Sequence, residues 1–358
     1  MSRINFVRGV PADEVFPRAE ILDSARAVVM TNDTPALRYG DAAGPQLMRE
    51  WVARAHGVDV DHVVLGNGSM GIFDLLCRAT LTPGDAIMLE EPCYDRVIEL
   101  SRLAGLKAQP VALRTGALDI DALRQTAAQT KARYFYCVPD FQNPSGATYP
   151  LDVRHALIKA ARELGFTIIE DSPYRRLRYE GEDLPSLLEL APDVTIHLTS
   201  FSKIIAPGLR AAYAIAPPEV IAAVSRMAES TYVTPGNFAL SVAGAWLAAG
   251  RLEPQIARLN QFYRPRRDAM VKALQLNFAS DAYAQPEGGF FVGVRLGRDI
   301  DVARLRQALA AEGIDIQDGR GFFVDDPDET FIRLPFAAIG PGDIAHGVAR
   351  LAAHAGSL

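Results

Sequence analysis

The sequence TSFSKIIAPGLR (residues 199–210) lies between two apolar runs with the composition of β-strands, residues 194–198 and 211–216. Lys203 therefore follows a predicted buried strand. Burial disfavours the charged form of a lysine amine, so an amine in such a place loses its proton more easily and can attack a carbonyl group. Three nearby side chains, two hydroxyls and one guanidinium, are suited to binding a phosphate group: Ser200, Ser202 and Arg210.

A lysine that forms a Schiff base beside a phosphate site is what pyridoxal phosphate requires. Taken alone, however, the stretch favours a different interpretation, an ordinary lysine in a partly solvated loop. Motifs elsewhere in the chain are needed to distinguish a cofactor-binding lysine from an ordinary loop lysine.

The composition is that of a globular protein large enough for two domains. The chain has 358 residues, of which 49% are hydrophobic and 22% charged, and its net charge is -6. An acidic chain has no general attraction for nucleic acids or anionic membranes, and no apolar stretch is long enough for a membrane span. The N-terminus lacks the apolar segment of a signal peptide. The three cysteines, Cys77, Cys93 and Cys137, are not spaced like the ligands of a metal ion. We therefore expect a cytoplasmic protein with reduced, packed cysteines, no metal site, and no nucleic-acid or membrane partner.

Short apolar runs alternate with helical patterns between residues 61 and 217, which predicts a buried, mostly parallel sheet covered by helices on both faces. We expect an α/β fold: a large domain with a seven-stranded sheet, and a smaller α/β domain formed by the N-terminal arm and the C-terminal part. The predicted divisions are an arm associated with the small domain (1–35), the large domain (36–255) and the small domain (256–358). The seven strand candidates are 62–65, 86–89, 107–111, 134–138, 167–170, 194–198 and 211–215.

The remaining pattern predicts the elements around this sheet. Helices are expected over 45–56, over 217–247 with an interruption at 234–236, and over 251–276, 302–312 and 341–353; further strands are expected over 289–296 and 330–334.

Ligands of parallel sheets lie beyond the carboxyl ends of the strands, and here several chemically active side chains follow strand candidates. A Gly-rich turn, residues 66–71, opens a helix and presents free N–H groups to an anion, although a plain turn explains it equally well. Tyr94 can stack on a planar ring or be an interior aromatic residue.

Two later strand ends carry amide, acid and phenol groups. Asn143 precedes Pro144, so its backbone is extended and its amide can face a ligand oxygen, or it forms a turn. Asp171 ends an apolar strand, where a carboxylate needs a partner such as a protonated pyridine nitrogen; a helix N-cap is the alternative. Tyr174 is close enough in sequence to reach an oxygen on the same ring.

The order of these motifs is specific, although each one alone is weak. Each motif follows a strand candidate, and along the chain they occur in this order: a Gly-Ser loop, an aromatic residue, Asn-Pro-x-Gly, Asp-x-x-Tyr, Ser-x-Ser-Lys and an arginine. In this order the chain resembles the class I/II aminotransferases of the fold-type I pyridoxal-phosphate family. The resemblance extends from Gly9-Val10-Pro11 to the segment 331–336, which is nearly the whole chain.

The resemblance implies roles for individual residues. Lys203 would form the internal aldimine and later move a proton between the substrate α-carbon and the cofactor, and Asp171 would pair with the pyridine nitrogen. Asn143 and Tyr174 would bind the ring hydroxyl oxygen. Tyr94 would stack on the ring. The phosphate would be bound by the N–H groups of Ser69 and Met70 and by the side chains of Ser200, Ser202 and Arg210, and Tyr39 would reach the phosphate of the neighbouring subunit. The substrate would be bound by Arg333, Asn143 and Gly9, with Arg333 on its α-carboxylate.

The implied function is a pyridoxal-phosphate-dependent aminotransferase that moves an amino group between an amino acid and a 2-keto acid by a ping-pong mechanism, in a homodimer with shared active sites. The same scaffold also supports elimination, cyclisation or oxidation of amino acids, so these reactions remain alternatives. A non-catalytic ligand-sensing domain of a transcription regulator is a third interpretation, disfavoured by the acidic chain.

The chain departs from the family pattern near the expected substrate pocket. The usual Pro-Gly turn is replaced by Asp318-Gly319-Arg320-Gly321, and Met70 and Gly293 stand where polar and aromatic residues are common. An arginine near the pocket would favour a dicarboxylic substrate such as glutamate or 2-aminoadipate, with Arg8, Arg18 and Arg320 as candidates. The acidic residues Asp13, Glu14, Asp325 and Asp326 would instead favour a cationic substrate, and solvated surface charge is the simplest explanation of each arginine.

Overall fold

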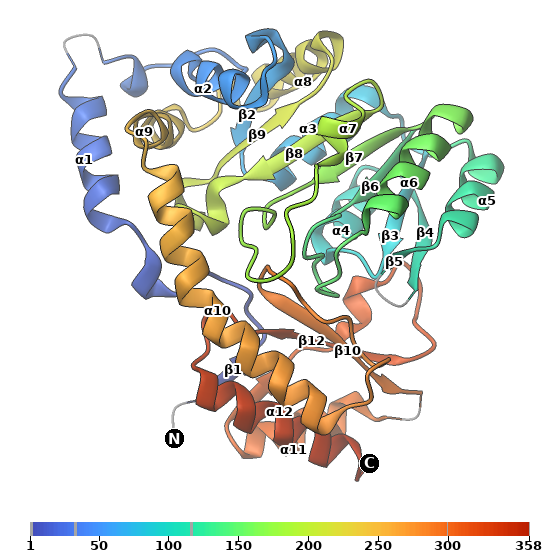
Figure 1. Ribbon diagram of the computed structural model, residues 1–358. Helices are drawn as coiled ribbons and strands as arrows, with labels where there is room; N and C mark the ends of the chain where they lie inside the picture. The colour runs from blue at the N-terminus through green and yellow to red at the C-terminus, as the bar shows by residue number, and fades with distance from the viewer. Residues whose placement is uncertain (1–2, 32–33, 115–116, 299, 358) are drawn as a thin grey trace.

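The computed structural model describes residues 3–31, 34–114, 117–298 and 300–357, and its centre is an eight-stranded sheet (Figure 1). The strand order is β2-β9-β8-β7-β6-β3-β4-β5. The strands are β2 (Val63–Asn67), β3 (Ala86–Glu91), β4 (Lys107–Arg114), β5 (Ala117–Leu118), β6 (Tyr134–Cys137), β7 (Thr167–Asp171), β8 (Thr195–Ser200) and β9 (Ala211–Ile215).

The sheet confirms the predicted mostly parallel arrangement. Strands β4, β3, β6, β7 and β8 run parallel to one another, and β9 is antiparallel to both of its neighbours, β8 and β2. All seven predicted strands are present. The predicted number was too low by one, because the two-residue strand β5 pairs antiparallel with the end of β4 and is too short to produce an apolar pattern.

Helices cover both faces of the sheet, as strand β6 illustrates. Tyr134 and Tyr136 point to the side of α3 and α4, whereas Phe135 and Cys137 point to the side of α5 and α6, and all four are buried. A strand buried on both faces needs an apolar residue at every position, which explains the continuous apolar runs of the sequence. The helices of this part are α2 (Gln46–His56), α3 (Ser69–Thr80), α4 (Asp95–Leu103), α5 (Ile120–Thr130), α6 (Leu151–Leu164), α7 (Leu187–Leu190), α8 (Pro218–Tyr232) and α9 (Asn237–Ala248).

The C-terminal part forms a second layer of strands and helices below the sheet (Figure 1). The long helix α10 (Leu252–Asn277) leads into it and packs against α12 (Pro341–Ala355). Strand β10 (Phe291–Gly297) pairs antiparallel with β12 (Thr330–Pro335), and α11 (Val302–Ala311) precedes β11 (Ile314–Ile316).

The N-terminal arm contacts both parts of the molecule. Its strand β1 (Ile4–Phe6) pairs parallel with β11, whereas its helix α1 (Arg18–Val29) packs against α9. The arm therefore crosses from the C-terminal layer to the helices of the large sheet (Figure 1). Short 3-10 turns complete the fold: Asp13–Val15, Pro35–Leu37, Val60–His62, Phe201–Lys203, Pro207–Leu209 and Gly319–Phe322.

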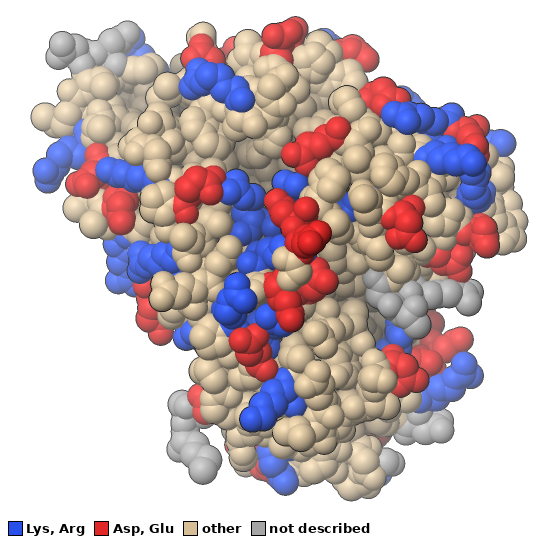
Figure 2. Space-filling model, in the orientation of Figure 1, with Lys and Arg blue, Asp and Glu red and all other residues tan. Residues whose placement is uncertain are grey.

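Acidic and basic side chains mix on the face seen in Figure 2, so that face has no broad area of one sign. Arg176 and Glu253, for example, form an exposed ion pair at 2.7 Å. Cys77, Cys93 and Cys137 are free and buried, as expected for packing residues. Within the described part of the chain, no helix has the length and apolar character that crossing a membrane requires.

Candidate active site

Lys203 follows the carboxyl end of β8, in a 3-10 turn, and its amine is enclosed by groups from distant parts of the chain. Its Nζ donates a hydrogen bond to the Gly9 carbonyl oxygen of the arm at 3.3 Å and lies 5.8 Å from the ring centroids of Tyr174 and Phe290. Burial, followed by the charge of Arg333, lowers the pKa of Lys203 to about 8. The amine is therefore partly neutral near physiological pH and can act as a nucleophile and as a base.

Asp171 is the last residue of β7 and not a helix N-cap, and its carboxylate is completely buried. Its Oδ2 atom accepts a hydrogen bond from the Tyr136 hydroxyl at 2.7 Å, while Oδ1 is buried without a hydrogen-bond partner among the residues that the structure describes. Burial raises the pKa of Asp171 to about 7. A buried carboxylate oxygen without a donor is costly, so this site is complete only when a cationic or N–H group faces Oδ1.

Asn143 and Tyr174 lie together, as the sequence order suggested. Both side chains are buried, and the Asn143 side chain is hydrogen-bonded to Tyr174. Burial raises the pKa of Tyr174 above its usual value, so its hydroxyl remains protonated at neutral pH. Asn143 Oδ1 also accepts a hydrogen bond from Arg333 Nη1 at 3.0 Å, which connects the ring-oxygen ligands to the predicted carboxylate ligand.

Arg333, on β12, is held between two aromatic rings. Its guanidinium carbon lies 4.7 Å from the ring centroid of Phe291 and 4.7 Å from that of Phe322. Nη2 donates to the Val7 carbonyl oxygen at 3.0 Å and to Gln317 Oε1 at 3.2 Å, and Nε is buried with no hydrogen-bond partner in the described part of the chain. The planar group is thus fixed in position and retains an unused donor, as binding of a substrate carboxylate requires.

Three of the predicted phosphate ligands, Ser69, Met70 and Arg210, lie together where α3 begins. Ser69 and Met70 are its first two residues, and N–H groups of a first helical turn have no intrahelical acceptor. Arg210 lies directly beside this turn, because its Nη2 donates to the Asn67 carbonyl oxygen at 3.4 Å. Gly68 is required there: its φ is +87°, and a Cβ atom on it would come within 2.0 Å of Arg210 Nη2. Ser200 ends β8 and Ser202 lies within the Lys203 turn, and both hydroxyl residues are buried.

Tyr94 and Tyr39 have different surroundings. Tyr94 is half-buried at the start of α4, and Asp171 and Arg333 both contribute to its pKa, so it lies near the centre of the site. Tyr39 has 85% of its surface exposed and lines a cavity of about 560 Å³ together with Leu47 and Asn237, away from the other predicted ligands. The role of Tyr39 in a neighbouring subunit therefore stays a prediction.

Two departures from the family pattern have a structural explanation. A Cβ atom on Gly293 would come within 2.2 Å of Cζ of Phe331, so the Phe331 ring of β12 fills the space that a side chain at position 293 of β10 would need. Arg320 is exposed and forms an ion pair with Asp318 at 2.7 Å. Of the three candidates Arg8, Arg18 and Arg320, Arg320 thus already has a carboxylate partner within the chain.

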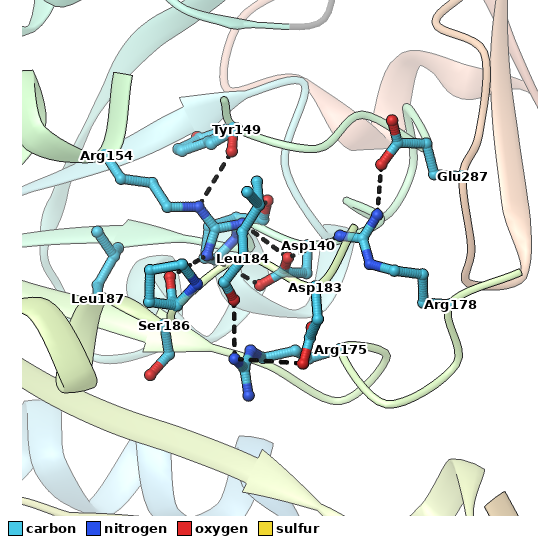
Figure 3. Close-up of polar contacts among 12 residues, drawn as sticks. Asp140, Tyr149, Arg154, Arg175, Arg178, Asp183, Leu184, Ser186, Leu187 and Glu287 are labelled. Atoms are coloured by element: carbon cyan, nitrogen blue, oxygen red, sulfur yellow. Dashed lines mark hydrogen bonds and ion pairs between the residues drawn. The ribbon is translucent and has the colours of Figure 1, made fainter. Parts of the chain in front are cut away.

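A buried ion pair fixes the loop that carries Asn143 (Figure 3). Arg154 of α6 is fully buried and pairs with Asp140 at 2.7 Å, between Nη2 and Oδ1. Its Nε donates to the Tyr149 carbonyl oxygen and its Nη1 to the Pro185 carbonyl oxygen, each at 3.0 Å. Arg178, which also pairs with Glu287, lies 3.7 Å from the same Asp140 oxygen. The loop is therefore attached to α6 and to the chain that follows β7.

We expect Arg154→Met to lower the free energy of unfolding by about 3–5 kcal/mol, because the change leaves the Asp140 carboxylate buried without its main partner. Urea denaturation would measure the loss. The matched control is Arg162→Met, whose pair with Asp193 is about half exposed, and it should cost less than about 1 kcal/mol. Equal losses in the two variants would contradict the structural role of Arg154.

The sequence interpretation missed several supporting residues. Glu90 is fully buried and accepts hydrogen bonds from the Tyr149 hydroxyl at 2.6 Å and Gln142 Nε2 at 3.0 Å, which shapes the same loop. A buried acid directly after an apolar strand was a usable signal for Glu90. Tyr136 and Gln317 gave no signal, because tyrosine is ordinary in a strand and glutamine is ordinary in a loop.

The assembled site fits pyridoxal phosphate. A partly neutral lysine amine, an unpaired buried carboxylate oxygen and a helix N-terminus with an adjacent arginine match its aldehyde, ring nitrogen and phosphate. Among the predicted ligands, Lys203, Asp171, Tyr174, Asn143 and Arg333 are brought together around one centre.

Comparison with known proteins identifies a matching family and similar sequences and structures. A sequence model of the family described as aminotransferase class I and II matches residues 4–351. The chain is 31% identical over 353 residues to the 2-aminoadipate transaminase of Thermus thermophilus, covering 97% of this chain and 89% of that protein. It is 30% identical over 363 residues to aromatic-amino-acid aminotransferase 1 of Thermococcus litoralis, covering 98% and 87%. The crystal structure of an α-aminoadipate aminotransferase from Thermus thermophilus, complexed with N-(5'-phosphopyridoxyl)-L-leucine, matches with a TM-score of 0.92 at 30% identity, covering 99% of this chain and 92% of that one.

Proposed function

We propose, from the premise that this chain belongs to the aminotransferase class I and II family, that the residues around Lys203 form its catalytic centre. The enzyme is a pyridoxal-phosphate-dependent transaminase that moves an amino group between an amino acid and a 2-keto acid. The bound cofactor supplies the electron sink that stabilises negative charge at the substrate α-carbon. The observation that carries the proposal is the unpaired Oδ1 atom of buried Asp171, within electrostatic reach of the Lys203 amine.

The protein groups of the site would then divide the work between them. Lys203 Nζ would hold the cofactor and, once released by substrate, move the proton at the substrate α-carbon. Asp171 Oδ1 would face the ring nitrogen, and Asn143 and Tyr174 would donate to the ring oxygen. Arg333 would bind the substrate α-carboxylate and so orient the bond that breaks.

A half-reaction distinguishes transamination from the alternatives on the same scaffold. Enzyme mixed with an amino acid alone should release one keto acid per subunit and then stop until a keto acid is added, because the amino group stays on the enzyme. Continued product formation without an acceptor would indicate elimination, cyclisation or oxidation. Absence of any turnover with a broad panel of amino acids would favour a ligand-sensing domain.

We further propose a substrate with a second carboxylate, recognised by Arg8. Arg8 is exposed and lies between Val7 and Gly9, whose carbonyl oxygens accept hydrogen bonds from Arg333 and Lys203. The arm therefore places this cation at the edge of the site. The similarity to a 2-aminoadipate transaminase supports the same substrate class, while the exposed residues Asp13 and Glu14 would instead suit a cationic substrate.

We expect Arg8→Gln to raise KM for glutamate and 2-aminoadipate about tenfold, which corresponds to the loss of one charge-assisted contact. KM for a neutral aromatic amino acid should change less than about twofold. Arg18→Gln is the matched control, because Arg18 is equally exposed but lies at the start of α1. Steady-state kinetics with the amino-donor panel would measure these values. A uniform change across all donors would rule out recognition by Arg8.

A homodimer is proposed on the exposed apolar surface around Tyr39. Leu37, Leu47 and Phe238 are 58%, 50% and 42% exposed, and this surface would be covered if a second subunit received Tyr39 at its phosphate site. Sedimentation analysis of the purified protein tests the assembly.

We retain the divisions 1–35, 36–255 and 256–358 as proposed domains. A cytoplasmic location is proposed on the three free cysteines.

A further inference from the structure

Tyr136 is a fully buried tyrosine whose hydroxyl is hydrogen-bonded to the carboxylate of Asp171 in the candidate site. It lies on β6, beside β7, with its ring edge-on to Phe73 at a centroid distance of 5.5 Å. The hydroxyl donates to Asp171 Oδ2 at 2.7 Å. Because the ring is packed between the sheet and α3, the position of the hydroxyl is fixed by the core.

The hydrogen bond determines how the Asp171 carboxylate is turned. A carboxylate can rotate about the bond to its Cβ atom, but a short bond from a fixed donor to Oδ2 sets the plane of the group. The other oxygen, Oδ1, then has one direction, and in that direction it is buried and has no partner among the described residues. One oxygen is held by the core and the other is left for a ligand.

We propose that Tyr136 is the positioning residue that holds Asp171 as an oriented carboxylate for the ring nitrogen of the cofactor. The inference rests on the proposed pairing of Asp171 with that nitrogen. Tyr136 acts through Asp171, so its effect on the cofactor depends on the presence of a carboxylate at position 171.

The charged surroundings of Asp171 indicate how the effect depends on pH. The pKa of Asp171 is raised to about 7: burial and the charge of Glu170 raise it, and the hydrogen bond from Tyr136 and the nearby His197 and Lys203 oppose the rise. Tyr136 itself has a pKa raised well above its usual value by burial, so it remains a donor. Removing the hydroxyl therefore raises the pKa of Asp171, and more of the carboxyl is protonated at pH 7 than at pH 9.

The test is the binding of pyridoxal phosphate to cofactor-free Tyr136→Phe protein, measured by absorbance titration at pH 7 and pH 9. We expect the dissociation constant to rise about tenfold over wild type at pH 7, because hydrogen bonds to charged groups are the stronger ones, and clearly less at pH 9. Tyr134→Phe is the matched control, since Tyr134 is buried on the same face of β6 but is hydrogen-bonded to Thr80. It should stay within about twofold of wild type at both pH values.

A double-mutant cycle separates positioning from general distortion. In Asp171→Asn protein, which has no ionisable group at this position, adding Tyr136→Phe should weaken binding by less than about twofold more. An unchanged affinity in Tyr136→Phe, an equal loss at both pH values, or a full additional loss in the double variant would overturn the inference. If Asp171→Asn itself binds as tightly as wild type, the proposed role of Asp171 falls, and the role of Tyr136 falls with it.

Discussion

Lys203→Ala should lower kcat by about 10⁴-fold, the largest effect that we expect from any single change in this chain. The substitution removes the amine that would hold the cofactor and move the proton at the substrate α-carbon. Lys203 Nζ lies within the site, beside the Gly9 carbonyl oxygen and the rings of Tyr174 and Phe290. Steady-state kinetics and the visible spectrum of the variant would measure the loss.

Two further experiments show whether the loss is one of proton transfer. Lys203→Arg keeps a positive charge, but arginine does not lose its proton in proteins, so this variant should be as inactive as Lys203→Ala. A small primary amine added to Lys203→Ala should restore part of the activity, since it can enter the space of the side chain and accept the proton. Activity of Lys203→Ala within tenfold of wild type would contradict the assignment.

Arg333→Lys should lower kcat/KM for amino acids by about 10²- to 10³-fold, although the charge is retained. A lysine ammonium cannot form the planar, two-pronged contact with a carboxylate, and it cannot stack between Phe291 and Phe322. It also loses the hydrogen bond to Asn143, so the ligand of the ring oxygen is no longer held. Steady-state measurements of kcat and KM would separate the two losses.

The specificity of this effect can be tested with a primary amine that has the same side chain but no α-carboxylate. Wild-type enzyme should prefer the amino acid strongly, and Arg333→Lys should lose most of that preference. Arg320→Lys provides the control, because Arg320 is exposed and paired with Asp318. A preserved preference in Arg333→Lys would place the carboxylate site elsewhere.

The fold could be predicted because burial on both faces leaves a strong pattern. Strand β6 is apolar or aromatic at every position, and such a run between helical patterns has few interpretations other than a covered parallel strand. Strand β5 could not be predicted, since two residues cannot produce a period. The packing of α1 against α9 was also beyond the sequence, because an exposed helix carries no information about which neighbour it will contact.

Much of the site could be predicted for a related reason. Lys203 and Asp171 lie at the carboxyl ends of adjacent parallel strands, so their positions follow once the strands are known. Gln317 and Tyr136 could not be identified in this way, because their importance comes from a single hydrogen bond across the fold. The ion pair between Arg320 and Asp318 could not be predicted either, because a solvated arginine and an arginine in an ion pair have the same sequence pattern.

The arrangement of Gly293 and Phe331 makes two positions on paired strands share one volume. Phe331 occupies the space that a side chain on residue 293 would need, and even a methyl group there would overlap its ring. A change of either residue alone is therefore costly: a larger residue at 293 overlaps the Phe331 ring unless that ring shifts, and a smaller residue at 331 leaves a void beside 293. Evolution or engineering that reshapes this wall has to treat the two codons as one unit.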